Sequence, residues 1–181
     1  RERILALAPG VDTRTFDTRF RDLSIWARVG ASRSSVKVLY VGRVSVEKNL
    51  PLLTTIWKMV MAGASRGGPG EARPELVIVG DGPYRATMER ELEGLNARFL
   101  GFRHGEELST LYASSDLFVF PSVTDTLGQV VMESQACGLP VIVSDQGGPK
   151  EVVSEGVTGF VLSAVSPGAR AGRILGLVRD R

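Results

Sequence analysis

The chain has 181 residues, enough for one domain with a sizeable core but short for two. Charged residues make up 23% and the net charge is only +2, which excludes the concentrated basic character of a nucleic-acid-binding protein. The single cysteine, Cys137, excludes an internal disulfide, and no apolar run reaches the roughly 18 residues that span a bilayer. We therefore expect a cytoplasmic protein; peripheral association with the inner face of the membrane, through segments outside this sequence, stays open.

The first 35 residues differ in character from the rest. The chain opens on Arg1 without an initiator Met, and residues 1–35 read as a loop-like lead-in with a polar, Ser-rich end. We expect residues 1–35 to be an interdomain segment and residues 36–181 to be one domain of a longer protein.

From residue 36 on, short apolar runs alternate with segments of helical periodicity, which predicts a parallel β-sheet covered by helices on both faces. The expected strands are 36–41, 75–79, 97–100, 116–120 and 140–143, with a possible sixth at 159–162. The expected helices are at about 50–62, 83–93, 105–114, 128–137, 147–153 and 167–179. Right-handed crossovers make this a doubly wound, Rossmann-like α/β fold of about six strands. The Gly- and Pro-rich segment 63–74 reads as a mobile surface insertion.

Ligands of such sheets bind beyond the carboxyl ends of the strands, so the loops there are the candidate site. After strand 36–41 come Gly42, Arg43 and Lys48, and the two cations can converge on one phosphate group. The alternative is a solvated pair of cations with Glu47 as a salt-bridge partner. Cations near a helix N-terminus oppose the helix dipole, which favours an anion between them.

Two further strand ends carry candidate residues. After strand 75–79, Asp81 and Gly82 precede Pro83, which suits the first position of a helix; a cap and tight turn without a ligand is the simpler interpretation. After strand 97–100, Phe102 can pack on a nucleobase and Arg103 lies beside it. The neighbouring His104 has no nucleophile motif with which to form a catalytic triad.

The turn after strand 116–120 is the most informative segment. Asp125 and Glu133 lie eight residues apart across a strand-to-helix turn that also contains Ser122. Thr126 is a plausible N-cap, and Leu127 and Gly128 would expose backbone N–H groups toward an anion. Carboxylates accept hydrogen bonds from hydroxyls, so phosphate and hydroxyl recognition together indicate a nucleotide sugar. The alternatives are that Asp125 acts as a competing helix cap and that Glu133 lies on an exposed face of the helix.

Several motifs are missing from the sequence. The third glycine of a dinucleotide fingerprint is replaced by Arg85, and no Gly-Lys dipeptide of a Walker-type loop occurs. No Asp-x-Asp metal clamp and no metal-ligand cluster is found, so we expect neither a cofactor nor a metal.

These residues together resemble the C-terminal, donor-binding domain of the GT-B fold glycosyltransferases, specifically the retaining family four. The resemblance covers residues about 9–164 in the expected order. Its motifs are the interdomain crossing at 8–12, the Arg and Lys segment at 42–49, and the segments 80–83, 100–102, 111–113, 121–122 and 138–142. Asp125 stands where the family's Glu-x7-Glu motif has its first Glu, one methylene shorter.

The resemblance implies transfer of a hexose from a nucleotide-diphosphate sugar to an acceptor hydroxyl, with retention at the anomeric carbon. It assigns the catalytic roles to Arg43, Lys48, Asp125 and Glu133, with Asp125 on the hexose and Glu133 on the ribose. It assigns the donor-binding roles to Gly42, Asp81, Gly82, Phe102, Arg103, Ser122, Thr126, Leu127 and Gly128.

The implied partners are the nucleotide-sugar donor and an N-terminal acceptor domain that this chain lacks, so the fragment alone is expected to be inactive or weakly active. Two alternatives stay open. One is a nucleotide-sugar epimerase or glycan phosphorylase on the same scaffold, and the other is a non-catalytic module that binds nucleotide sugars.

Overall fold

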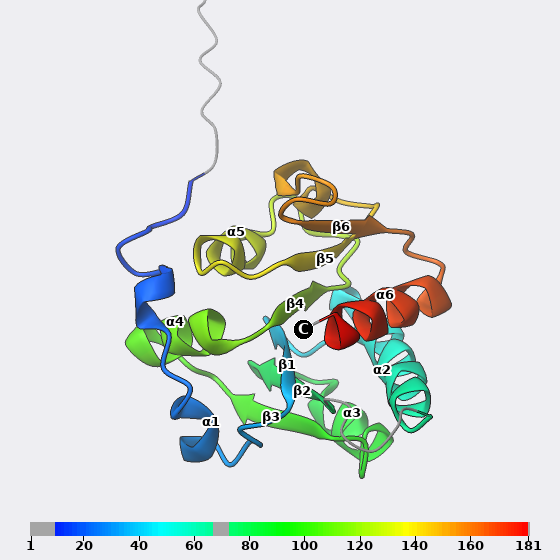
Figure 1. The fold of residues 1–181 in the computed structure, drawn as a ribbon. Helices are drawn as coiled ribbons and strands as arrows, with labels where there is room; N and C mark the ends of the chain where they lie inside the picture. The colour runs from blue at the N-terminus through cyan, green and yellow to red at the C-terminus, as the bar shows by residue number, and fades with distance from the viewer. Residues whose placement is uncertain (1–9, 67–72, 181) are drawn as a thin grey trace, which may run out of the picture.

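Six strands form one parallel sheet in the computed structural model, which describes residues 10–66 and 73–180 (Figure 1). The strands are β1 (Val36–Val41), β2 (Pro74–Val79), β3 (Ala97–Gly101), β4 (Leu117–Phe120), β5 (Val141–Ser144) and β6 (Gly159–Leu162). They are ordered β3-β2-β1-β4-β5-β6, and every neighbouring pair is parallel. The predicted doubly wound, Rossmann-like sheet is confirmed.

Helices cover both faces of this sheet. The α-helices are α1 (Ile25–Arg28), α2 (Leu50–Ala64), α3 (Arg85–Glu91), α4 (Gly105–Ser114), α5 (Gln129–Ala136) and α6 (Pro167–Arg179). Short 3₁₀ helices are η1 (Thr18–Phe20), η2 (Val46–Lys48) and η3 (Pro149–Val152). Helices α2, α3 and α6 lie on one face, and α1, α4 and α5 lie on the other (Figure 1). In the described part of the chain, no helix is both long and apolar enough to cross a membrane.

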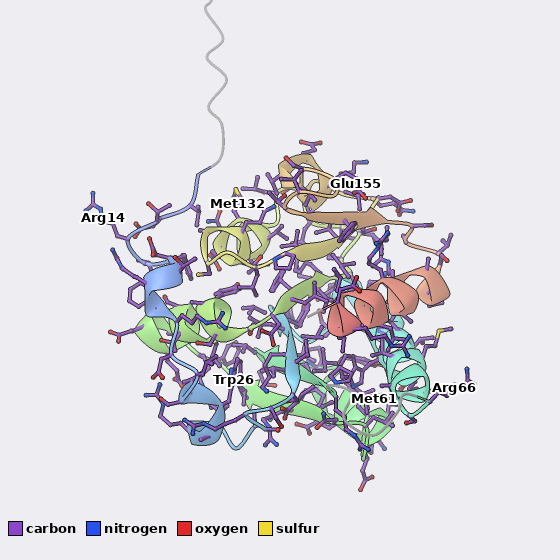
Figure 2. The ribbon with its side chains drawn as sticks, viewed as in Figure 1. Arg14, Trp26, Met61, Arg66, Met132 and Glu155 are labelled. Atoms are coloured by element: carbon purple, nitrogen blue, oxygen red, sulfur yellow. The ribbon has the colours of Figure 1, made fainter. Side chains whose placement is uncertain are left out.

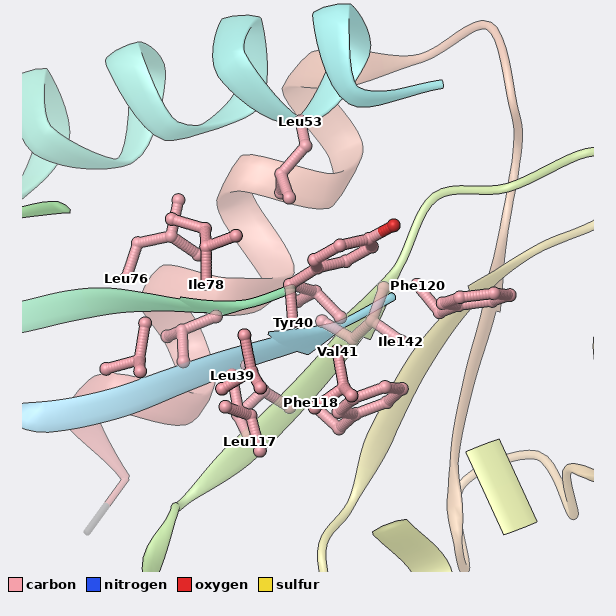
Figure 3. Close-up of a cluster of buried hydrophobic side chains, with 14 of the residues drawn as sticks. Leu39, Tyr40, Val41, Leu53, Leu76, Ile78, Leu117, Phe118, Phe120 and Ile142 are labelled. Atoms are coloured by element: carbon pink, nitrogen blue, oxygen red, sulfur yellow. The ribbon is translucent and has the colours of Figure 1, made fainter. Parts of the chain in front are cut away.

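The strand sequences follow from this double cover. Every residue of β1, β2, β4 and β5 is buried, so these strands read as nearly continuous apolar runs. Figure 3 shows Leu53 of α2 pointing at the sheet from one side, while Phe118 lies among the side chains on the other. Helix α2 buries residues at spacings of three and four, and each such apolar side chain contributes about 1.5–3 kcal/mol.

Two predicted helices begin later than expected. Pro83 lies in a turn instead of the first helical position, because the N–H of Tyr84 bonds to Val44 O and that of Arg85 to Gly82 O. The predicted helix 147–153 is only the 3₁₀ helix η3, since Gly147 has a left-handed φ of 79° that no right-handed helix accommodates.

The lead-in is more ordered than its sequence indicates. We expected residues 1–35 to be loop-like, but η1 and α1 lie within them, and Trp26 (Figure 2) is only 2% exposed. Its indole Nε1 donates to Ser114 O at 3.2 Å, which fastens α1 to the end of α4. Residues 8–9 of the expected crossing at 8–12 and the central part of the insertion, 67–72, lie outside the described residues. The ends of that insertion belong to α2 and β2.

The topology fixes where a ligand can bind. The chain order reverses between β1 and β4, so the loops that leave these two strands turn toward opposite faces of the sheet. In doubly wound sheets this switch point, at the carboxyl ends of the strands, is where ligands bind.

Candidate functional site

The loops after β1 and β4 meet at this switch point. Lys48 Nζ lies 2.6 Å from Asp125 Oδ1 in an ion pair whose side chains are 26% and 20% exposed. The Asn49 amide donates to Pro121 O at 3.2 Å, and the Thr124 hydroxyl donates to Glu47 O at 3.2 Å. Two of the predicted site residues, Lys48 and Asp125, therefore lie in direct contact although 77 residues separate them.

The loop after β2 packs on the loop after β1 through backbone atoms. The N–H of Gly42 bonds to Val79 O at 3.0 Å, and a Cβ on Gly82 would lie only 2.4 Å from Val44 O. Gly82 is thus required because the loops after β1 and β2 approach each other closely. Asp81 accepts from the Gly82 N–H at 2.7 Å and pairs with Arg85 at 3.0 Å, as in the simpler interpretation of a cap and tight turn.

The 123–128 loop is held from the other side by the loop after β5. The N–H of Gly148 bonds to Asp125 O at 2.8 Å, and a Cβ on Gly148 would meet Thr126 O at 1.7 Å. Gly148 was not predicted as a site residue. The two successive glycines, Gly147 and Gly148, after a strand were the sequence signal that another segment packs closely against this loop.

The start of α5 has free backbone donors. Thr126 is not the N-cap as predicted; the N-cap is Gly128, with φ of 72° and no side chain to bond to the helix. For the N–H groups of Thr126, Leu127 and Gly128, residues 10–66 and 73–180 provide no acceptor. These donors and the helix dipole make this turn a suitable anion site.

Two buried oxygens beside this turn lack donors. Asp125 Oδ2 and the Ser122 hydroxyl are both buried and have no hydrogen-bond partner among the described residues. An unsatisfied buried acceptor costs about 1–3 kcal/mol, which a ligand hydroxyl would remove. Asp125 therefore has one oxygen fixed by Lys48 and a second available to a ligand.

Glu133 lies in a different setting from Asp125. Its Oε2 accepts a hydrogen bond of 3.1 Å from the hydroxyl of Tyr112 on α4, a residue that is fully buried. Burial raises the pKa of the Glu133 carboxyl, and the Tyr112 hydrogen bond lowers it in part. Tyr112 lies in the segment 111–113 that carries part of the family resemblance, but it was not predicted as a site residue, because its contact with Glu133 depends on how α4 and α5 pack.

The two predicted phosphate-binding cations have different partners. The Arg43 side chain is 64% exposed and lies 3.6 Å from Glu47, the salt bridge that formed the alternative interpretation, whereas Lys48 pairs with Asp125. An exposed pair of this kind contributes about 0–1 kcal/mol, so Arg43 can turn toward an anion at small cost.

Phe102 and Arg103 lie at the end of the edge strand β3, and no hydrogen bond or ion pair within the described residues joins them to Lys48 or Asp125. The Phe102 ring is 63% exposed and stacks on His104 at 6.3 Å. Arg103 donates to Phe102 O at 2.8 Å. Among the described residues, no group of three or more acidic, histidine or cysteine side chains could hold a metal ion.

Known proteins are similar to this chain in sequence and in fold. The sequence model of the family "Glycosyl transferases group 1" matches residues 35–180. Sulfoquinovosyl transferase SQD2 of Arabidopsis thaliana is 38% identical over 85% of this chain and 29% of its own length. A GDP-mannose-dependent alpha-mannosyltransferase of Corynebacterium glutamicum is 37% identical over 87% of this chain and 35% of its own length.

One solved structure has nearly the same length as this chain. The C-terminal domain of the group 1 glycosyl transferase LpcC of Francisella tularensis superposes with a TM-score of 0.75 over 93% of this chain and 88% of that domain, at 17% identity. The chain spans about a third of the length of the two relatives above. The family match over most of the sequence, together with the shared fold, shows that the chain belongs to the glycosyl transferases group 1 family.

Proposed function

We propose that this chain is the donor-binding half of a GT-B glycosyltransferase that transfers a hexose from a nucleotide-diphosphate sugar to an acceptor hydroxyl, with retention. The observation that carries the proposal is the Lys48–Asp125 pair at the switch point, with a buried free carboxylate oxygen beside free backbone N–H groups. Hydroxyl acceptors next to anion donors match a sugar joined to a diphosphate.

The diphosphate lies at the start of α5 in this proposal. The N–H groups of Thr126, Leu127 and Gly128 donate to one phosphate, and Arg43 and Lys48 supply the positive charge. Charge develops on the departing diphosphate as the glycosidic bond breaks, so donors that are already oriented stabilise the transition state more than the bound donor.

The sugar and nucleoside occupy the two sides of that turn. Asp125 Oδ2 accepts from hexose hydroxyls, Glu133 accepts from the ribose, and Ser122 completes the wall between them. Gly42 and Gly82 let the loop backbone pack closely beside the ligand, because a Cβ on Gly42 would meet the Tyr40 hydroxyl and one on Gly82 would meet Val44 O. The exposed Phe102 ring can cover the base. Asp125 is one methylene shorter than glutamate, so a hexose must lie correspondingly closer to β4.

None of these residues is placed as a general base. Asp125 and Glu133 recognise and position the donor, while the acceptor and any further catalytic groups come from a partner domain of the same longer protein. We propose that the site works without a divalent ion, because Arg43, Lys48 and the α5 N-terminus supply the positive charge that a metal supplies elsewhere. A cytoplasmic location belongs to the same proposal.

Calorimetric titration of the chain with UDP-, GDP- and ADP-sugars tests donor binding. We expect one nucleotide series to bind, and Arg43→Gln to weaken it about tenfold, the value of one charged hydrogen bond. Arg90→Gln on the exposed side of α3 is the matched control and leaves affinity unchanged. Absence of binding in all three series contradicts the site assignment. In the full-length protein, NMR of the product's anomeric configuration tests retention. If Arg43→Gln leaves the biological role of the full-length protein intact, a non-catalytic module is favoured.

A further inference from the structure

A cleft lies apart from the switch point, on the α1 and α4 face of the sheet. This cleft has a volume of about 770 Å³ and is enclosed by η1, α1, the edge strand β3 and the first half of α4. Its volume falls within the range of about 300–1,000 Å³ that small-molecule sites occupy. Arg103 is the one predicted donor-site residue that lines it, and neither Lys48 nor Asp125 does.

The lining of this cleft carries an excess of positive charge. Five arginines contribute to it: Arg19, Arg21, Arg28, Arg98 and Arg103. Three acidic residues lie among them, so the lining has an excess of two positive charges. Arginine is the side chain best suited to bind phosphate, because its planar fork donates two parallel hydrogen bonds.

The carboxylates of this region do not satisfy all the arginine donors. Glu75 is shared by two cations, Arg98 at 3.2 Å and the buried Lys37 at 3.4 Å. Arg103 Nε is buried 3.0 Å from Glu107 Oε1 but makes no hydrogen bond within the described residues. For Arg21, the described part of the chain holds no ion-pair or hydrogen-bond partner of its guanidinium.

The floor of the cleft is apolar. Phe20, Val29 and Phe99 line it and are only partly buried, beside the buried Ile25 and Leu100. The Arg19 guanidinium lies 5.0 Å from the centroid of the Phe20 ring. An inorganic ion would leave this floor uncovered. An organic group attached to the phosphate would cover it and gain the free energy of apolar burial.

We propose that this cleft binds the phosphate monoester of an organic molecule, with the phosphate on the arginines and the organic part on the apolar floor. A phosphate monoester carries a charge of about −1.5 to −2 at pH 7, which balances the excess of the lining. The phosphate belongs either to a soluble metabolite or to a lipid headgroup. Because this cleft is separate from the switch point, the proposal does not depend on the proposed function.

Titration of the ¹⁵N-labelled chain with phenyl phosphate, followed by NMR, locates the site. We expect saturable shifts at the amides of Val29, Leu100 and Thr110, at least tenfold tighter binding than inorganic phosphate, and no shifts with phenol. Shifts confined to residues 126–128, or none that saturate, would overturn the proposal. The Arg19→Gln/Arg21→Gln double variant should weaken binding at least tenfold, and Arg90→Gln should leave it unchanged; equal affinity in the double variant also overturns it.

Two further measurements distinguish a lipid headgroup from a soluble phosphate as the ligand, and the cleft from the switch point as the binding site. Vesicles of phosphatidylcholine with phosphatidic acid should retain the chain more strongly than pure phosphatidylcholine if the ligand is a lipid headgroup; if phenyl phosphate binds and vesicles do not, the ligand is a soluble phosphate. Arg43→Gln should weaken nucleotide-sugar binding and leave the cleft shifts intact. Loss of donor binding alone therefore contradicts the proposed function, and loss of the cleft shifts alone contradicts this inference.

Discussion

Two lysine–carboxylate pairs lie at opposite ends of the sheet and differ in how completely they are satisfied. Lys37 on β1 pairs with Glu75 on β2 at 3.4 Å, and both side chains are at most 2% exposed. Lys48 pairs with Asp125 at the carboxyl ends, where both side chains are about one fifth to one quarter exposed. The chemistry of the pairs is the same, so their surroundings decide what each one does.

The pair at the amino end has no free oxygen to offer. Glu75 accepts from the Ser32 N–H at 3.1 Å, from the Ser35 hydroxyl at 2.7 Å and from Arg98 at 3.2 Å. Lys37 donates to the carbonyl of Ser35 as well. These bonds attach the lead-in to the sheet. At the other end Asp125 Oδ2 has no partner among the described residues, so the first pair is structural and the second is available to a ligand.

We call Lys37–Glu75 the closed pair and Lys48–Asp125 the open pair. Removing the carboxylate of the closed pair has the largest expected effect on the free energy of unfolding. Glu75→Ala leaves the Lys37 ammonium buried without its counter-ion, and loss of one partner of a buried pair costs about 3–5 kcal/mol. Urea unfolding followed by circular dichroism measures the fall in the free energy of unfolding. Glu93→Ala, at an exposed position, is the control and should change it by less than about 0.5 kcal/mol. A loss below about 1 kcal/mol for Glu75→Ala would show that the closed pair is not structural.

Removing a carboxylate from the open pair should affect binding more than folding. Asp125→Ala deletes the acceptor proposed for the sugar, so we expect nucleotide-sugar affinity to fall about tenfold or more, corresponding to about 1.5–3 kcal/mol for hydrogen bonds to a charged group. Lys48 becomes free to bind phosphate, so the matching nucleoside diphosphate without the sugar should bind as well as before or better. Calorimetry with both ligands measures the difference. Equal losses for both would mean that Asp125 does not contact the sugar.

Both residues of the open pair were predicted as site residues, although their ion pair was not, and neither residue of the closed pair was predicted. The strands stand out because full burial makes them continuous apolar runs, and Lys48 and Asp125 lie in loops whose glycines mark the strand ends. Lys37 and Glu75 are single charged residues within apolar strands. Their pairing becomes evident only from the strand register, which places Lys37 beside Glu75. Contacts that depend on packing between distant elements carry no local pattern.

The Tyr112–Glu133 contact also depends on packing between distant elements. It offers a finer test of the candidate site at the carboxyl ends of the strands. Tyr112→Phe removes the hydrogen bond that lowers the pKa of Glu133, so that pKa should rise further above its ordinary value. In the proposed site Glu133 accepts from the ribose as a carboxylate. Donor affinity is then lost as the pH falls through this pKa, and the variant should lose affinity at a higher pH. Calorimetry from pH 5 to 8 measures the shift. A profile identical to wild type would separate Tyr112 from donor binding, and Glu133→Gln should remove the acid limb altogether.

Metal removal should have the smallest effect and thereby tests which charges serve the open end. If Arg43, Lys48 and the N–H groups at the start of α5 neutralise the diphosphate, EDTA leaves nucleotide-sugar affinity within about twofold, and added Mg²⁺ does not restore the loss in Arg43→Gln. Calorimetry in EDTA and in Mg²⁺ on wild type and Arg43→Gln makes the comparison. A tenfold dependence on Mg²⁺ in the wild type would mean that a divalent ion, held through the donor, carries the charge assigned to these residues. The Lys48–Asp125 pair would then be a fixed wall of the site, as Lys37–Glu75 is at the opposite end, and would not be a contact that phosphate and sugar share.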